Sequence, residues 1–184
     1  MNRTLACFIF LALAAPVTAQ RSPQGAPSVQ ATQMKKLDFL LGKWQGSGYV
    51  EYVPGQRGNF TETENIEAKV GGLVDVVEGT GMSKMPNGAE AVTHSALAVV
   101  SYDEASSAFR WQAYSGGNGS AQYVETVATV GDKTLDWGYQ DSRAGSFRFA
   151  IMLDENGQWS ETGEMSHDGK TWQKFFEMTL QRVP

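Results

Sequence analysis

From Lys43 onward, apolar and polar residues alternate along the chain with a period of two, which is the pattern of half-buried β-strands. The runs are rich in Val, Thr, Phe, Tyr and Trp, and each ends at a Gly, Asn, Asp or Pro turn signal. The pattern predicts ten strands, over residues 44–53, 60–70, 73–85, 89–102, 108–115, 121–130, 134–140, 146–154, 158–167 and 171–183.

Only residues 32–41 have the character of a helix, with Thr32 as a candidate N-cap. Because the connections between strands are short and no long crossover is present, we predict an all-β domain that closes into an antiparallel up-and-down barrel. Closure leaves no exposed edge strand, and a ten-stranded barrel is wide enough to hold a ligand. A β-sandwich is the alternative arrangement of the same strands.

The N-terminal residues have the pattern of a secretory signal. Arg3 supplies a positive charge, residues 5–15 form an apolar run, and small residues lead to a cleavage site near Ala19. The apolar run is too short for a membrane-spanning helix, which needs about 20 residues. We therefore expect residues 1–19 to be a signal peptide and the protein to be exported, either periplasmic or secreted.

Composition limits the chemistry of the mature chain. Residues 20–33 carry Pro, Gly, Ser and Gln with little apolar bulk, which is typical of a disordered spacer, so the barrel domain is expected at 34–184. The only cysteine, Cys7, lies in the predicted signal, which excludes disulfides and thiolate sites from the mature chain. The formal charge is −5 and no cluster of Lys or Arg stands out, which argues against nucleic acid or an anionic membrane surface as a partner.

The start of the predicted barrel carries a motif. Apolar residues run into Gly42-Lys43-Trp44, followed by Gly46 and Gly48. This opening resembles the Gly-x-Trp motif of the lipocalin and fatty-acid-binding (calycin) group. The longer Gly-x-Trp-x-Gly-x-Gly form is similar to nitrobindin-like haem barrels and to related bacterial lipocalin-like families of unknown function.

The resemblance implies a ten-stranded barrel in which the first-strand Trp packs at the closed end against an Arg near the C-terminus. The matching residues are Trp44 and Arg182, and we expect them to form a barrel-closing structural pair. A guanidinium group over an indole ring contributes about 0.5–2 kcal/mol, depending on its desolvation.

Nitrobindin-like proteins bind haem through a histidine on the last strand, and residues 172–183 contain no histidine. The two histidines, His94 and His167, lie on other predicted strands. A strand methionine such as Met178 is more often a packing residue than an axial ligand. We therefore expect no resident cofactor and no metal site, with haem ligation through His94 or His167 as an alternative.

Hairpin geometry predicts which side chains face the barrel interior. A two-residue turn at Asp168-Gly169 would pair His167 with Lys170. A three-residue loop at 155–157 would place the apolar residues Phe147, Phe149, Ile151 and Leu153 of the preceding strand on the same face as Trp159. Because Arg182 must meet Trp44, the face that contains Arg182 is taken as the inner one. The predicted inner face comprises Phe147, Phe149, Ile151, Leu153, Trp159, Glu161, Gly163, Met165, His167, Trp172, Lys174, Phe176, Met178, Leu180 and Arg182.

This face is mostly aromatic and aliphatic with few polar groups, as is usual for a small-molecule pocket. The predicted ligand-binding residues are Phe149, Trp159, Glu161, Met165, Phe176 and Met178. The same residues could instead fill the barrel as a dry core, in which a Glu161–Lys174 ion pair would satisfy both charges.

No Ser-His-Asp order, phosphate-binding loop or metal-spaced histidine pair is present in the sequence. The leading hypothesis is therefore an exported, non-catalytic barrel that binds a small apolar or amphipathic molecule. The alternative is a lipocalin-like enzyme of isomerase, hydratase or decarboxylase type, with Glu161 as a general base of raised pKa.

Overall fold

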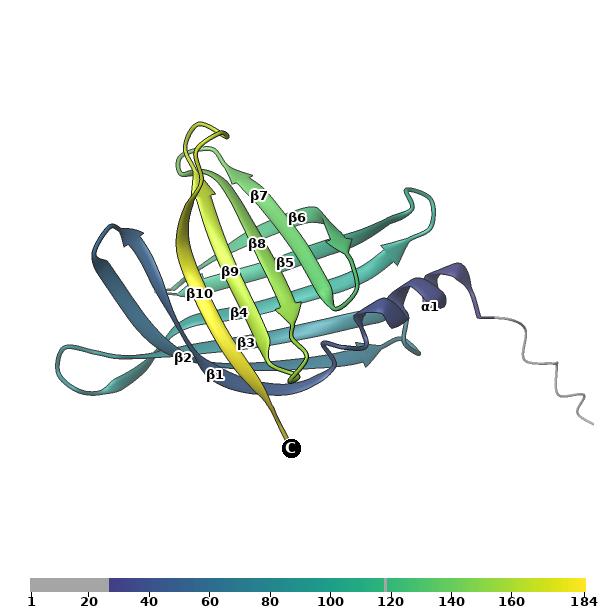
Figure 1. Ribbon diagram of the computed structural model, residues 1–184, viewed down its shortest axis with the longest axis horizontal. Coiled ribbons are helices and arrows are strands. Elements are labelled where there is room, and N and C mark those ends of the chain that lie inside the picture. Colours follow the sequence, from purple (N-terminus) through teal and green to yellow (C-terminus); the bar gives the residue numbers. More distant parts are fainter. Residues whose placement is uncertain (1–26, 118) are drawn as a thin grey trace, which may run out of the picture.

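The computed structural model, which describes residues 27–117 and 119–184, is a closed antiparallel barrel of ten strands with one short helix (Figure 1). Every strand pairs with its sequence neighbours, and β1 pairs with β10 to close the barrel. This confirms the predicted all-β barrel and excludes the β-sandwich. The predicted signal peptide and residues 20–26 of the predicted spacer lie outside the described residues, whereas residues 29–33 of that spacer are helical.

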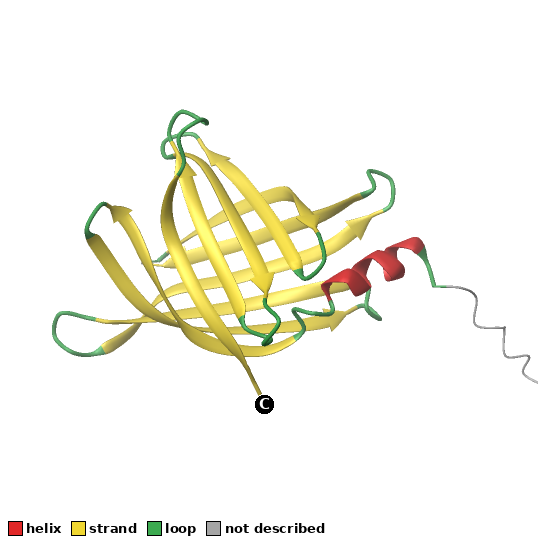
Figure 2. Ribbon diagram, in the orientation of Figure 1, coloured by secondary structure: helices red, strands yellow, loops and turns green. Residues whose placement is uncertain are grey.

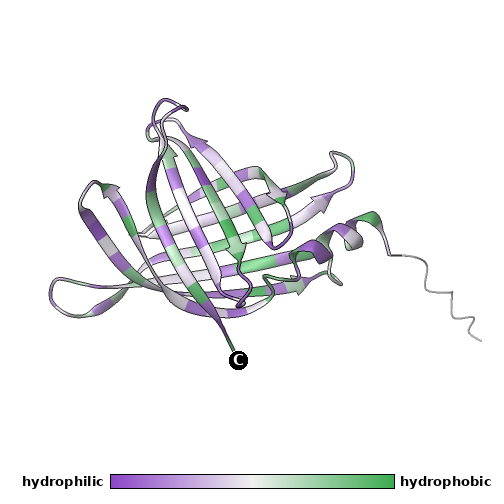
Figure 3. Ribbon diagram, in the orientation of Figure 1, coloured by the Kyte–Doolittle hydropathy of each residue, from purple (hydrophilic) through white to green (hydrophobic). Residues whose placement is uncertain are grey.

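The strands agree with the predicted runs to within a few residues at most ends, and hydropathy alternates along them (Figure 3). Their bounds are β1 (Gly42–Val53), β2 (Gln56–Lys69), β3 (Val74–Lys84), β4 (Glu90–Asp103), β5 (Ala108–Gly117), β6 (Ser120–Val130), β7 (Thr134–Asp141), β8 (Gly145–Leu153), β9 (Trp159–Ser166) and β10 (Gln173–Val183).

The helix α1 (Val29–Met34), continued by the 3₁₀ turn η1 (Lys35–Leu37), lies at one end of the barrel (Figure 2). It begins earlier than predicted, because the N-cap is Ser28, whose Oγ accepts a hydrogen bond from the Ala31 amide at 3.1 Å. Thr32 lies inside the first turn. No helix in the described residues is long and apolar enough to cross a membrane.

Trp44 is the centre of the closed end of the barrel, where α1 packs. It is 1% exposed, and its indole Nε1 donates to the Leu40 carbonyl at 2.8 Å. Its ring meets the Trp159 ring edge-on at 5.4 Å. Leu37 and Leu40, both almost fully buried, complete this core, so the segment after α1 is fixed to the barrel through Trp44.

The ladder between β1 and β10 places Arg182 opposite Trp44. The Arg182 guanidinium lies over the indole ring at 4.2 Å and donates to the carbonyl oxygens of Phe39 (2.9 Å) and Leu41. Arg182 is exposed at the rim of the barrel, so its cation–π contact falls at the weak end of the range, about 0.5–1 kcal/mol.

The barrel wall is weakest between β6 and β7. These strands pair only at Thr129↔Asp136 and Val130↔Leu135, close to the end that carries α1, whereas β7 and β8 pair along their whole length. Toward the opposite end β6 and β7 separate.

Removing either member of the closing pair is expected to destabilise the barrel. Trp44→Ala should lower the free energy of unfolding by about 3–5 kcal/mol through the cavity it leaves. Arg182→Met, which keeps the apolar stem, should lower it by about 1–3 kcal/mol through lost charged hydrogen bonds. Urea unfolding measures both, and Arg143→Met, in the exposed β7–β8 turn, is the matched control. An Arg182→Met effect no larger than that of the control would contradict the assigned role.

Candidate ligand site

The six predicted ligand-binding residues all lie on the inner face of the barrel. Phe149 lies on β8, Trp159, Glu161 and Met165 on β9, and Phe176 and Met178 on β10. The β8–β9 loop has the predicted form, because Asp154 donates its amide to the Gln158 carbonyl and Gly157 has a positive φ of 76°. Trp159 and Met178 belong to the buried core, so the part they play in ligand contact stays a prediction.

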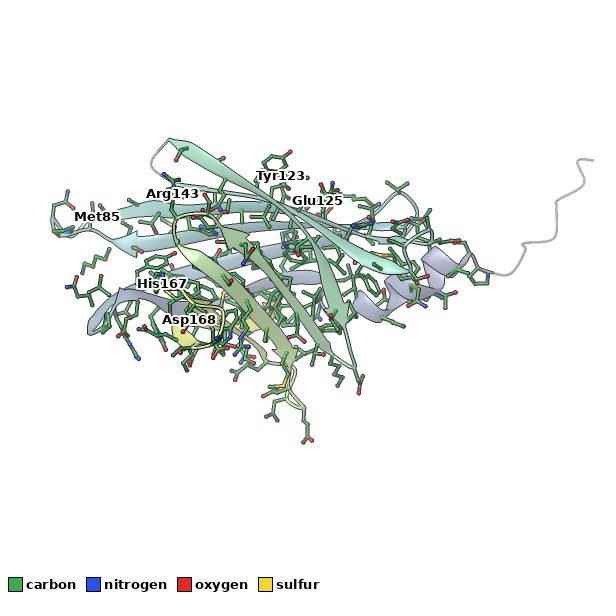
Figure 4. All side chains as sticks on the ribbon, turned by 90° about the horizontal axis from the view of Figure 1, so that it is seen from above. Met85, Tyr123, Glu125, Arg143, His167 and Asp168 are labelled. Atoms are coloured by element: carbon green, nitrogen blue, oxygen red, sulfur yellow. The ribbon has the colours of Figure 1, made fainter. Side chains whose placement is uncertain are left out.

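The β9–β10 connection differs from the predicted two-residue turn, and three of the predicted inner residues are wrong as a result. Residues 167–172 form a loop, held by the Asp168 carboxylate, which accepts the amide hydrogens of Lys170 and Thr171. His167 is exposed in this loop (Figure 4). Trp172 lies under the Arg148 guanidinium at 4.1 Å, on the outer surface.

Lys174 is the third incorrect inner residue. A bulge between Lys174 and Phe176 turns Phe175 into the barrel, where it is 3% exposed. Lys174 therefore stands opposite Glu164 on the outer face and forms an ion pair with Glu177. The anticipated Glu161–Lys174 ion pair does not form, so Glu161 has no basic partner from that strand.

Aromatic rings line one wall of the interior. The Phe149 ring stacks on Trp137 at 4.3 Å, and Trp137 stacks on Trp111 at 5.1 Å. The indole N–H groups of Trp111 and Trp137 are buried and form no hydrogen bond with any described residue. The wall is therefore a stacked aromatic cluster that carries two unpaired indole donors.

Two carboxyl groups that sequence reasoning missed lie on the inner face of β2. Glu62, only 4% exposed, and Glu64 alternate with Phe60 and Ile66, which also face inward. One carboxylate oxygen of each is buried and has no hydrogen-bond partner among the described residues. The signal was present in the sequence, because the period of two places all four side chains on one face.

Glycines on the neighbouring strands make room for these carboxyl groups. Glu62 stands between Gly46 and Gly81 in the sheet, and Glu64 stands beside Gly79. A Cβ atom on Gly81 would lie 2.7 Å from Glu62 Oε2, and one on Gly79 would lie 2.7 Å from Glu64 Oε1. Any side chain at either position would therefore displace a carboxylate.

Burial raises the pKa of all three inner glutamates, because it penalises the charged form. Burial raises the pKa of Glu161 to about 8. The Trp159 indole N–H, although it forms no hydrogen bond of ordinary geometry, lowers this pKa in part, and the Glu62 charge raises it further. Burial raises the pKa of Glu62 to about 7, offset in part by the Thr80 amide. It raises that of Glu64 well above 4.5, with further contributions from Glu161 and Glu62.

Near the end opposite α1, the barrel interior is open to solvent. His94 pairs with the inward-facing Gly81, and Tyr52 stacks on the inward-turned Phe175 at 5.3 Å. Both side chains are exposed, and Tyr52 is 64% accessible, yet enclosure by protein lowers the pKa of His94 and raises that of Tyr52. Side chains of the inner face are therefore accessible to solvent at this end of the barrel.

These residues fit haem poorly. His94 is the one histidine on the inner face, β10 supplies none, and His167 is in an outer loop. The buried charged side chains of the described residues are all acidic, which disfavours the propionate groups of haem. Among the described residues, no group of three His, Cys, Asp or Glu side chains is placed to hold a metal ion.

A groove of about 520 Å³ opens on the side of the barrel where β6 and β7 separate. Its wall includes Trp137 and Phe149 of the inner face together with Arg148 and Glu164 of the outer face. The last two form an ion pair at 2.6 Å at the rim. The volume lies within the range of small-molecule sites, about 300–1,000 Å³.

The stability of the barrel should fall as pH rises from about 5 to about 8. In that window the folded state holds protons on Glu62, Glu64 and Glu161 that the unfolded state releases, so the free energy of unfolding decreases with pH. One pKa unit corresponds to about 1.4 kcal/mol. Urea unfolding at several pH values should show a flatter profile for Glu161→Gln and an unchanged one for Glu78→Gln, an exposed outer glutamate. Asp75, with a pKa raised to about 6 by burial and by the Asp38 charge, leaves some residual slope.

Comparison with known proteins supports the fold. No protein-family model matches the sequence, and no curated protein matches it with significant similarity. The crystal structure of Rv2717c from M. tuberculosis is similar with a TM-score of 0.58 and 13% identity, over 82% of this chain and 97% of that one. The S-type phycobiliprotein lyase CPES from Guillardia theta is similar with a TM-score of 0.53 and 12% identity, over 86% and 99% of the two chains. At these identities the likeness shows a shared lipocalin-like barrel fold.

Proposed function

We propose that the barrel binds a small amphipathic organic molecule in its lumen and holds it without chemical change. The observation that carries the proposal is the set of buried polar groups that lack a partner in the described residues: Glu62 Oε1, Glu64 Oε2 and the indole nitrogens of Trp111, Trp137 and Trp159. Each such group costs about 1–3 kcal/mol when it stays unpaired. A ligand that supplies the partners recovers that free energy.

The aromatic wall supports the same proposal. Stacked rings at Trp111, Trp137 and Phe149 bury a flat ligand well, and a few polar groups among them fix its orientation. The groove between β6 and β7 contacts Trp137 and Phe149 of this wall from the outer side of the barrel. We further propose that the protein acts after export, in the periplasm or outside the cell.

A neutral hydrophobic probe tests the binding function. N-phenyl-1-naphthylamine should bind saturably and gain fluorescence as it enters the lumen. Phe149→Leu, which removes one ring from the stack on Trp137, should weaken binding by roughly 2- to 12-fold, the equivalent of one aromatic pair.

Tyr123→Leu is the matched control, because Tyr123 pairs with Tyr114 on the outer surface of β6 and is exposed (Figure 4). It should leave the affinity unchanged. If the probe fails to saturate, or if both variants weaken it equally, the lumen is not the binding site and the proposal fails.

Proton-transfer catalysis by Glu161 is the second candidate. Glu161 is 8% exposed, and its pKa of about 8 keeps it largely protonated at neutral pH, so it would begin a reaction as a general acid rather than as a base. Glu62, whose charge raises the pKa of Glu161, would supply the second group that acid–base chemistry needs. One protein of similar fold is named as a lyase, so this barrel can serve an enzyme.

Native mass spectrometry separates the two candidates. The protein is purified from its own host, and any co-purified molecule is identified by mass and then incubated with the protein in D₂O. A carrier returns the molecule with deuterium only at exchangeable N–H and O–H positions. An acid–base enzyme introduces deuterium at carbon, and Glu161→Gln abolishes that incorporation while the molecule still binds.

A further inference from the structure

We propose that the ligand carries a protonated nitrogen, bound among Glu62, Glu64 and Glu161, and an aromatic body that lies against Trp137 and Phe149. The inference rests on the proposed binding function and names the chemical class of the ligand. It follows from the charge of the interior, from the spacing of the carboxyl groups and from the unpaired indole donors.

The buried acidic groups of the interior have no buried basic residue to balance their charge. The buried charged side chains of residues 27–117 and 119–184 are Glu62, Asp75 and Glu161, and none of the buried residues is Lys or Arg. The acidic outer residues, in contrast, are often paired, as in Arg148–Glu164 and Lys174–Glu177. A buried carboxylate without a cationic partner is costly, so it either holds a proton or binds a cation.

An organic cation suits the spacing of these groups better than a metal ion does. Glu62 and Glu64 project from β2, whereas Glu161 projects from β9, with β1 and β10 between them in the barrel wall. They act on one another electrostatically, yet they are not grouped closely enough to coordinate one ion. A substituted ammonium group has several donors and a larger radius, so it can contact more than one of these carboxyl groups.

The unpaired indole groups can bind the part of the ligand that does not carry the positive charge. Trp111 is 6% exposed, and its Nε1 has no hydrogen-bond partner among the described residues, so it offers a donor to an acceptor atom of the ligand. β7, which carries Trp137, lies five strands from β2 in the ten-stranded ring. The carboxyl groups of β2 and the Trp137 wall therefore face each other across the lumen, and indole faces also attract cations.

Three matched probes test the inference: 1-naphthylmethylamine, 1-naphthalenemethanol and 1-naphthoate. They share one ring system and carry a positive, a neutral and a negative group. Isothermal titration calorimetry at neutral pH should give the amine at least about tenfold higher affinity than the alcohol, which corresponds to 1.4 kcal/mol. The carboxylate should bind most weakly.

Substitutions of the glutamates test which residues are responsible for the preference for the amine. The double variant Glu62→Gln/Glu161→Gln should lower the affinity for the amine about tenfold or more and leave that for the alcohol unchanged. Glu78→Gln removes an exposed carboxylate from the outer face of β3 and should change neither. Because glutamine removes buried charge and keeps the side-chain size, folding of the double variant is expected and is checked by its thermal unfolding.

Amine binding also depends on pH through the ionisable groups of the inner face, among them Glu62, Glu64, Glu161, His94, Tyr52 and Tyr139, with Asp75 and Tyr102 at the closed end. Uptake of the amine should displace protons from the glutamates. Titration in two buffers of different ionisation enthalpy should therefore show net proton release for the amine and none for the alcohol.

The outcomes separate the two proposals. Equal affinities for amine and alcohol, or tightest binding of the carboxylate, would overturn the cationic ligand and leave a binding barrel. An amine preference that survives the double variant would place the cation elsewhere and also overturn the assigned site. If none of the three probes binds and N-phenyl-1-naphthylamine does not bind either, the proposed function itself fails.

Discussion

The pairing of β1 with β10 closes the sheet into a barrel and so brings the two ends of the domain together. It joins the first strand of the barrel to the last along an unbroken register from Lys43↔Val183 to Val50↔Phe176. Within it, the Trp44 indole is buried under the segment that follows α1, and Arg182 ties the chain at Phe39 to the end of β10. Without this ladder the barrel has two free edges, and the inner face loses its opposite wall.

The same ladder explains the glycines of the opening motif. A Cβ atom on Gly48 would lie 2.6 Å from Met178 Cβ and 2.8 Å from Phe60 Cζ, so a side chain there would collide with the neighbouring strands. Gly46 stands in the sheet between Leu180 and Glu62. The two glycines are therefore a steric requirement of the close approach of β1 to β10.

The sequence predicted the strands because turn residues and the period of two are local signals, and the loop at 155–157 fixed the inner face of β8 and β9. Other features needed tertiary contacts. Phe175 and Phe176 are both apolar, so composition could not reveal the bulge that reversed Lys174. The separation of β6 from β7 could not be predicted either, because both segments have the ordinary alternating pattern of paired strands. The acidic site could be predicted in part, because Glu62 alternates with the apolar Phe60 and therefore shares its face of the strand. The electrostatic interaction of Glu62 with Glu161 could not be predicted, because the two residues come together only when the barrel closes.

Stability and binding occupy different parts of this barrel. The closed end contains the best-buried residues, among them Leu37, Trp44 and Leu180. It provides a hydrophobic core without help from the inner carboxyl groups. Burial of Glu62 and Glu161 without a cationic partner opposes folding, because it removes two ionisable groups from water. Since glycines on β3 also make room for Glu62 and Glu64, the acidic interior destabilises the fold in two ways: the carboxyl groups are desolvated, and the packing that larger side chains would give is lost. The cationic ligand proposed above would offset the desolvation of the carboxyl groups, because it would supply the opposite charge that the described part of the chain does not place beside them.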